Sequence, residues 1–160
     1  MQTINDLMQI HPHAGALEWI GLRPGRDAPM QVVDEVEVQP GQGLKGDRFS
    51  GKNSDKRAVT LIHAEHLTAV ASYLHREDVD PGLVRRNLVV RGLNLLALKE
   101  RQFRIGEEVI LEWTGECHPC SKMEKNLGPG GYNAMRQHGG ITARVIQGGT
   151  IRRGDAIVPL

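Results

Sequence analysis

Short alternating runs separated by glycine recur along this chain and limit the folds that it can adopt. The clearest run, 107–113, places Val109, Leu111 and Trp113 on one face, which is the period of two that is typical of a sheet strand. Glycine is abundant, with 19 among 160 residues, whereas only 4% of the residues are aromatic. This composition suits many short strands joined by tight turns. We therefore expect a mainly β protein with a few short helices.

Further strands are expected where short runs of β-branched or other apolar residues, some of them alternating with polar ones, lie between turn residues. The segments that meet this description are 16–22, 32–38, 58–62, 87–90, 141–146, 150–152 and 155–158. The last three are close together and separated by glycine, so we expect them to form a closing set of hairpins.

Helical spacing is found in only a few places. A short helix is expected at 3–10, with Thr3 as its N-cap. Segment 63–74 switches to helical spacing, with an apolar stripe made of Leu67, Val70, Ala71 and Leu74. Asp80 before Pro81 predicts a single helical turn. Two more short helices are expected at 123–127 and 132–137.

Length and charge bound the organisation of the chain. A single domain is expected at 160 residues, with 1–15 as an N-terminal extension and 16–160 as the domain. The formal net charge of +1 gives no electrostatic reason to expect nucleic acid or an anionic membrane as partner. No apolar run has the length of a membrane span, and the first residues do not resemble a signal peptide. We therefore expect a cytoplasmic protein.

Both cysteines of the chain lie in one segment, 114–124, directly after the clearest strand, which we expect to end at Gly115. Pro119 stands where a helix would begin, so the thiol of Cys120 would lie near a helix N-terminus. Backbone N–H groups in that position favour the thiolate. Thiol or soft-metal chemistry is therefore expected here.

Four interpretations of this Cys-x-x-Cys segment compete. A disulfide is disfavoured because no secretory signal precedes the cysteines. No zinc is expected, because the pair supplies two of the four ligands required and only His118 and His138 lie near it in sequence. A thioredoxin-like motif should follow an early strand, yet only about 40 residues remain after it. The fourth interpretation, a thiol buried as a small hydrophobe, stays open for Cys117.

Two groups of basic residues flank the central strands. A glycine-rich loop, 40–48, carries Lys45 and Arg48 and leads into Lys52, Lys56 and Arg57. Such a loop can bring N–H groups and cations to a phosphate, although this one has neither nucleotide-binding glycine motif and equally fits a solvated basic loop. The second group consists of Arg85, Arg86 and Arg91. By contrast, His63 and His66 lack a third ligand in register and are expected to be surface histidines.

Six motifs in a fixed order carry a resemblance to a known family. They are Gly46-Asp47-Arg48, Val59-Thr60-Leu61-Ile62, Arg85-Arg86-Asn87-Leu88-Val89-Val90, Phe103-Arg104-Ile105-Gly106, Pro119-Cys120-x-x-Met123-Glu124 and Gly148-Gly149-x-Ile151-x-x-Gly154-Asp155. Together they resemble the MOSC domain, named for the C-terminal domain of molybdenum cofactor sulfurases, in its small stand-alone bacterial form. The resemblance implies a strongly bent, mostly antiparallel β-barrel with a few short helices.

The resemblance also implies a function. Members of the family are thought to bind the molybdenum cofactor, a pyranopterin dithiolene with a phosphate, and relatives reduce N-hydroxylated bases and amidoximes. In those relatives one cysteine gives its thiolate to molybdenum, and the matching position is Cys120. The metal would take the hydroxyl oxygen from an N–OH substrate. The cofactor phosphate and the pterin edge would meet Lys45, Arg48, Arg57, Arg86 and Asn87. At the level of the family, pyridoxal phosphate binding is implied as well.

The chain lacks the N-terminal barrel domain and the iron–sulfur extension of larger relatives, so electrons would come from a separate reductase. That departure keeps two other functions open. One is a sulfur carrier that holds a persulfide on Cys120, with Cys117 as the resolving thiol. The other is a binding module that stores or hands over the cofactor without catalysis.

Overall fold

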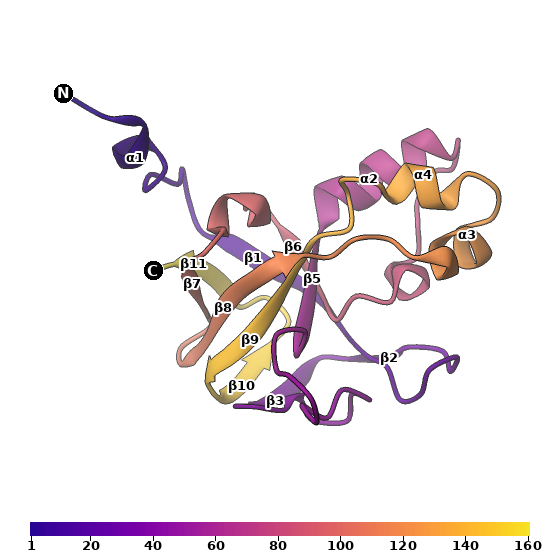
Figure 1. Cartoon of the computed structure of the whole chain (residues 1–160), viewed down its shortest axis with the longest axis horizontal. Coiled ribbons are helices and arrows are strands. Elements are labelled where there is room, and N and C mark those ends of the chain that lie inside the picture. The colour runs from indigo at the N-terminus through magenta and orange to yellow at the C-terminus, as the bar shows by residue number, and fades with distance from the viewer.

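The computed structural model describes residues 1–160 and contains a closed β-barrel with helices packed against one end (Figure 1). Strand β1 (Gly15–Leu22) closes the barrel, because it pairs with β6 (Leu88–Arg91) on one side and, through Gly15 and Ala16, with β11 (Ala156–Pro159) on the other. Between them the order is β7 (Gln102–Ile105), β8 (Val109–Glu116), β9 (Ile141–Gln147) and β5 (Val59–His63). Every barrel pairing is antiparallel except β5 with β6. The prediction of a mostly antiparallel barrel is confirmed.

A second, smaller sheet corrects two predictions. The expected strand 32–38 is divided at Asp34 into β2 (Gln31–Val33), which extends the barrel sheet beyond β1, and β3 (Glu35–Gln39). Strand β3 pairs with β10 (Gly149–Arg152) and β4 (Gly43–Leu44). The closing hairpins are therefore not formed, since β9, β10 and β11 pair with distant strands rather than with one another. Long-range pairing buries Val36, Val38 and Ile151 in the core, which local hairpins would not do.

Strand β5 is buried along its whole length, and its polar residues Thr60 and His63 are buried as well. Val59 and Leu61 belong to the barrel core of 23 buried residues. Ile62 faces the other way, into a second core of 12 residues between the barrel and the helices. That second core receives side chains from α2 (Ala64–Tyr73), α3 (Ser121–Leu127) and α4 (Gly131–Met135). The predicted stripe of α2 is confirmed, as Leu67, Val70 and Ala71 are buried there.

The helix caps predicted at Thr3 and Asp80 are confirmed. Thr3 forms a capping box with Asp6 at the start of α1 (Ile4–Leu7), which is shorter than the expected 3–10. Asp80 accepts a hydrogen bond of 2.9 Å from the Gly82 N–H at the 3-10 helix η1 (Pro81–Val84).

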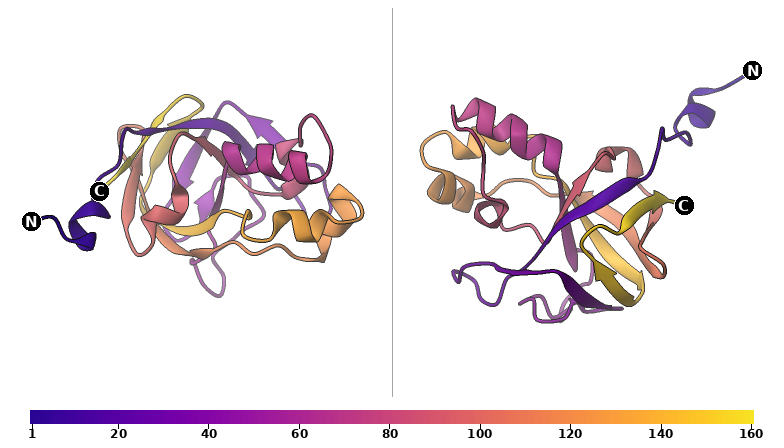
Figure 2. Two further views of the ribbon diagram at one scale, coloured as in Figure 1. Left: turned by 90° about the horizontal axis from the view of Figure 1, so that it is seen from above. Right: turned by 180° about the vertical axis from the view of Figure 1, so that it is seen from behind.

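The N-terminal arm that carries α1 projects from the barrel on the side away from α2 to α4 (Figure 2). A further 3-10 helix, η2 (Leu95–Leu98), precedes β7. No helix of the chain combines the length and apolarity needed to span a membrane.

The prediction that His63 is a surface histidine is wrong, because the residue is only 3% exposed. His63 ends β5 and occupies the N-cap position of α2, and the centroid of its ring lies 3.9 Å from that of His66. His66 in turn meets the ring of His138 at 4.8 Å. The Leu95 N–H donates to Nε2 of His63 at 2.8 Å, and Nδ1 has no partner. Sequence reasoning missed this because the strand end and the helix start converge only in the fold.

Acid should destabilise the fold through His63. Burial, followed by repulsion from His66, lowers the pKa of His63 from 6.5 to about 4. The unfolded chain therefore binds more protons between these values, so stability is present above pH 6.5 and is lost as pH falls toward 4, by about 3 kcal/mol at most. Urea unfolding at several pH values would measure this slope. We expect a smaller slope in His63→Asn and the wild-type slope in His75→Asn, an exposed histidine. An unchanged slope in His63→Asn would contradict the assignment.

Candidate functional site

The two thiols lie where β8 leaves the barrel. Strand β8 does not end at Gly115 as predicted but continues through a register shift to Glu116. The Cys117 N–H then donates to the Gly140 carbonyl at 2.8 Å. A Cβ on Gly139 would lie 1.9 Å from the Cys117 carbonyl oxygen. Glycine is therefore required beside the thiol segment.

The two cysteines differ in accessibility. Cys117 is buried and Cys120 is exposed. Helix α3 begins at Ser121 rather than at Pro119, so Cys120 is its N-cap, as expected for a thiol at a helix start. Both cysteines line one small hollow of about 160 Å³, called the thiol hollow below. The accessible nucleophile or metal ligand is thus Cys120.

The lining of the thiol hollow is strongly cationic. Besides the cysteines it contains Thr60, His118 and Met123, and no carboxylate. Seven of its 12 residues are basic: Arg23, Arg26, Arg48, Arg57, Arg85, Arg86 and Lys122. Cations gathered in this way repel one another and attract an anion, most strongly a phosphate that can accept several charge-assisted hydrogen bonds.

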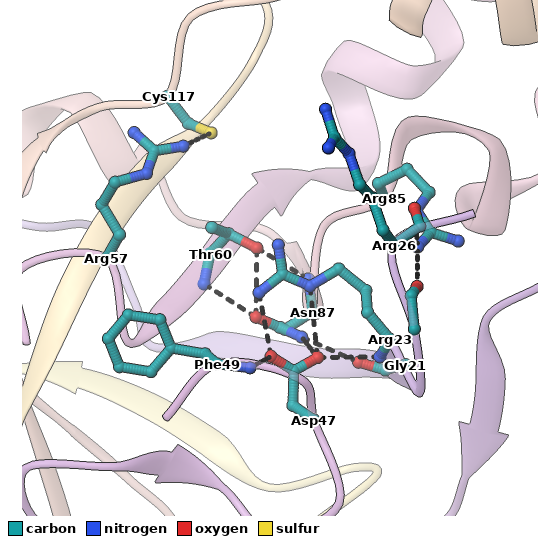
Figure 3. A network of polar contacts seen from close by, with 11 residues as sticks. Gly21, Arg23, Arg26, Asp47, Phe49, Arg57, Thr60, Arg85, Asn87 and Cys117 are labelled. Atoms are coloured by element: carbon teal, nitrogen blue, oxygen red, sulfur yellow. Dashed lines mark hydrogen bonds and ion pairs between the residues drawn. The ribbon is translucent and has the colours of Figure 1, made fainter. Parts of the chain in front are cut away.

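A buried carboxylate anchors this cationic group. The Asp47 side chain is 0% exposed and pairs with the Arg23 guanidinium at 2.9 Å. Asp47 also accepts hydrogen bonds from the Arg23 and Phe49 N–H groups, at 2.7 and 3.2 Å. Burial raises the pKa of the Asp47 carboxyl, but the hydrogen bonds and charge of Arg23 outweigh it and hold the pKa below its ordinary value. Figure 3 shows the Asp47 carboxylate within a network that includes Arg23 and Asn87.

Asn87 is placed differently from what the sequence suggested. Its Nδ2 donates to the Gly21 carbonyl and to Asp47 Oδ1, at 3.0 and 3.1 Å. Its Oδ1 accepts from the N–H and the hydroxyl of Thr60, at 3.1 and 3.2 Å. The side-chain donors and the acceptor of Asn87 are thus bonded within the chain, and 0% of the residue is exposed. Asn87 therefore has no hydrogen-bonding group available for a ligand. The structure does not support the prediction that Asn87 meets the pterin edge, because its side chain links β1 and β5 beside β6.

Arg86 lines the thiol hollow but is only 6% exposed, and its donors are directed to the chain itself. They reach the carbonyls of Gly139, Val84 and Cys117, at 2.9, 2.8 and 3.3 Å. Burial lowers the pKa of the Arg86 guanidinium, and the two cysteines oppose that shift. Arg86 therefore holds the thiol segment in place and adds a buried positive charge beneath it.

The other predicted residues divide into two cases. Arg48 and Arg57 line the thiol hollow, and Nη2 of Arg57 donates to Sγ of Cys117 at 3.9 Å (Figure 3). Lys45 does not line it, since its side chain is 69% exposed and pairs with Glu37 at 3.6 Å. The turn after β4 directs Lys45 away from the hollow, so the prediction that it binds the cofactor is not supported.

Three basic residues of the lining were missed: Arg23, Arg26 and Lys122. Arg85 was named only as a member of the second basic group and was not assigned to the site. Arg23 and Arg26 surround a Pro-Gly pair that the sequence marks only as the end of a strand. Arg85 adopts a left-handed backbone with φ of 63° and donates to the carbonyls of Gly25 and Arg26, at 2.9 and 3.1 Å. The sequence shows only that these residues are basic. That they converge on one hollow depends on the fold.

Comparison with known proteins agrees with this architecture. The MOSC domain family model matches residues 47–158. Among solved structures, the YUAD protein from Bacillus subtilis is 18% identical, covering 91% of this chain and 94% of its own, with a TM-score of 0.81. YiiM from Geobacillus stearothermophilus is 19% identical, covering 91% and 75%, with a TM-score of 0.74. YiiM from Escherichia coli is 21% identical, covering 93% and 70%, with a TM-score of 0.70. No curated protein matches the chain. At these identities the structural likenesses establish the fold alone.

Removing the Asn87 amide should be costly. Asn87→Ala would remove the side-chain acceptor of the buried Thr60 N–H and the donor to the Gly21 carbonyl, which should lower the free energy of unfolding by about 2–4 kcal/mol. Urea unfolding would measure the loss. Asn133→Ala, an exposed substitution of the same type on α4, should change stability by less than about 0.5 kcal/mol. Equal effects of the two substitutions would contradict the structural role of Asn87.

Proposed function

The chain belongs to the MOSC domain family, and from that premise we propose that it binds the molybdenum cofactor in the thiol hollow and reduces N-hydroxylated compounds. One observation carries the proposal: the exposed thiol of Cys120 shares a small hollow with seven cations and no carboxylate. A soft anionic donor thus lies beside groups suited to a phosphate.

The donor set of the hollow fits the cofactor. No three His, Cys, Asp or Glu side chains are close enough together to hold a metal ion. A metal at Cys120 would therefore need its other ligands from a bound group, and a dithiolene supplies two sulfurs. A thiolate is a suitable further donor for a metal already bound to sulfur. The phosphate of the same group requires cations, which the lining provides.

Five residues in or beside the hollow have a defined part in this proposal. Cys120 would give its thiolate to the metal, and Arg26 and Arg48, both exposed and without an ion pair, would bind the phosphate. Arg86 and Gly139 would keep the thiol segment in position. When bound, the cofactor supplies two-electron chemistry and accepts the oxygen of an N–OH group. The chain itself orients the group and shapes the site, and electrons come from a separate reductase.

A second candidate, a sulfur carrier, is supported by one observation: both thiols line the same hollow. A persulfide on Cys120 could pass its outer sulfur to an acceptor nucleophile, which leaves the Cys120 thiolate. Alternatively, the thiolate of Cys117 could attack Sγ of Cys120 and release hydrosulfide. That route leaves a Cys117–Cys120 disulfide, which a dithiol reductant would have to open. Cys117 is buried beside Arg57, so the second of these routes would first have to expose it. The cofactor proposal is preferred because it also uses the seven cations of the lining.

The Cys120→Ser substitution tests the proposal. Protein purified from a host that makes the molybdenum cofactor should contain molybdenum, and Cys120→Ser should retain roughly tenfold less or lose it, because a hydroxyl is a poor ligand for a soft metal. Elemental analysis for molybdenum and zinc measures this. The thermal transition should shift by no more than about 2 °C, since Cys120 is exposed. Cys117→Ser is the matched control and should retain molybdenum.

Other results would favour the alternatives. Full molybdenum and full activity in Cys120→Ser would contradict the ligand assignment. Bound molybdenum without reduction of any N-hydroxylated compound would favour a binding module. Absence of molybdenum together with a persulfide on Cys120 in the intact-protein mass would favour the sulfur carrier.

A further inference from the structure

The loop that leads from β1 into β2, residues 24–30, has no regular structure of its own (Figure 1). No backbone-to-backbone hydrogen bond involves these seven residues. Their carbonyls are instead bound by side chains from other elements. Arg85, the C-cap of η1, donates to the carbonyls of Gly25 and Arg26, at 2.9 and 3.1 Å, and also to that of Ala28 (Figure 3). One guanidinium thus holds three points of the loop.

A second side chain joins the loop to the helix that begins at the exposed thiol. The Lys122 ammonium donates to the Arg26 carbonyl at 2.8 Å and pairs with Asp27 at 3.5 Å. Lys122 lies in the first turn of α3, two positions beyond Cys120. Arg85 and Lys122 are called the latch below, because they donate all four hydrogen bonds that hold the loop.

Both ends of the loop are fixed to the barrel, whereas its middle is not. At the first end, Arg23 pairs with buried Asp47 at 2.9 Å, and the Arg23 carbonyl accepts from the Arg48 N–H at 2.7 Å. At the second end, Gln31 pairs with Leu22 in the ladder between β1 and β2. A segment with fixed ends and an exposed middle held by two side chains can open without unfolding the barrel.

The loop lies between two hollows. Arg26 lines the thiol hollow, whereas residues 27–30 line an outer hollow of about 350 Å³ that also contains Trp19 and Leu83. Arg85 lines both hollows. Release of the latch would therefore join the two spaces.

The loop also limits the room beside the exposed thiol. The thiol hollow, at about 160 Å³, is smaller than the usual small-molecule site. A cofactor bound at Cys120 would therefore extend into the adjoining hollow of about 700 Å³, which shares Arg23, Arg48 and Arg57 with it. A second compound beside Cys120 would then need space on the opposite side, which loop 24–30 covers.

We propose that loop 24–30 is a gate, closed in this structure by the latch, that opens to admit the N-hydroxylated substrate beside Cys120. The gate follows from the contacts of the loop alone, while its use for substrate entry rests on the proposed function. A substrate too large for the closed thiol hollow binds only the open form, so its apparent affinity falls with the open fraction. The apolar lining of the outer hollow, which includes Trp19, Met30 and Leu83, then receives the body of that substrate.

Trypsin cleavage after Arg26 measures the opening, because a protease cuts the population in which the segment is released. In Arg85→Gln/Lys122→Gln this cut should be at least about tenfold faster than in wild type, since all four hydrogen bonds to the loop are lost. Peptide masses followed over time give the rate. Lys125→Gln/Arg153→Gln makes the same change of charge at two exposed positions outside the latch and should be cut at the wild-type rate.

Cleavage after Arg104, within β7, reports unfolding of the barrel in the same experiment. Its rate should be the same in the latch variant as in wild type. A wild-type rate at Arg26 in the latch variant, or equal acceleration at Arg26 and Arg104, would overturn the gate.

A reversible bridge tests the gate while the latch is intact. A Cβ on Gly82 would lie 3.7 Å from the Cβ of Met30, which is the separation found in disulfides. Oxidation of the Met30→Cys/Gly82→Cys variant should therefore tie the end of the loop to η1 and slow the cut after Arg26 about fivefold. The reduced form of the same variant is the control. Equal cleavage of the two forms, with the bridge verified in the peptide masses, would overturn the gate.

The same bridge tests substrate entry in cofactor-loaded protein. Oxidation of Met30→Cys/Gly82→Cys should raise KM for benzamidoxime about fivefold and leave KM for hydroxylamine unchanged, because only the larger compound needs the open form. Equal changes of KM for the two compounds would overturn entry through the gate and leave the proposed function intact. If neither compound is reduced by wild type, the proposed function fails, and the gate is judged from the cleavage rates.

Discussion

The buried carboxylate of Asp47 is the interaction on which the rest of the site depends. It binds Arg23 at the end of β1, and Asn87 links it to Thr60 on β5. Three segments that are distant in the sequence are thereby fixed at one end of the barrel, and Arg48 and Phe49 follow directly from the anchored residue. A buried ion pair of this kind adds little net stability, but losing one partner leaves an uncompensated charge. Its effect is to hold the mouth of the hollow in one arrangement.

The arrangement of cations around the thiols has a cost in stability. Like charges in the thiol hollow repel one another, and the lining offers no carboxylate to offset them. Backbone carbonyl oxygens offset part of the positive charge of Arg85 and Arg86 by accepting their hydrogen bonds. An anionic ligand that binds only the folded chain would relieve the repulsion and stabilise the fold. This trade of stability for binding is common at functional sites.

The barrel also explains why the two thiols differ. Cys117 continues from β8 and is held against Gly139 and Gly140, where it is buried. Cys120 lies beyond Pro119, at the start of α3, where the chain has left the barrel. Both thiols line the thiol hollow, but Cys117 is buried beside Arg57 whereas Cys120 is exposed. A single accessible thiol is what a metal ligand needs, whereas a resolving thiol would have to become exposed.

The sequence by itself determined the features that depend on neighbouring residues. Alternation in β8, the apolar stripe of α2, the caps at Thr3 and Asp80 and the place of Cys120 at a helix start were all predictable, because period and capping act over a few residues. Only the tertiary structure decided that Asn87 is buried, that Lys45 points away and that Arg23 converges on the thiols. It likewise decided the burial of His63 and the division of the chain at Asp34. These outcomes depend on pairing between distant strands, which sets where each side chain lies and which local pattern does not encode.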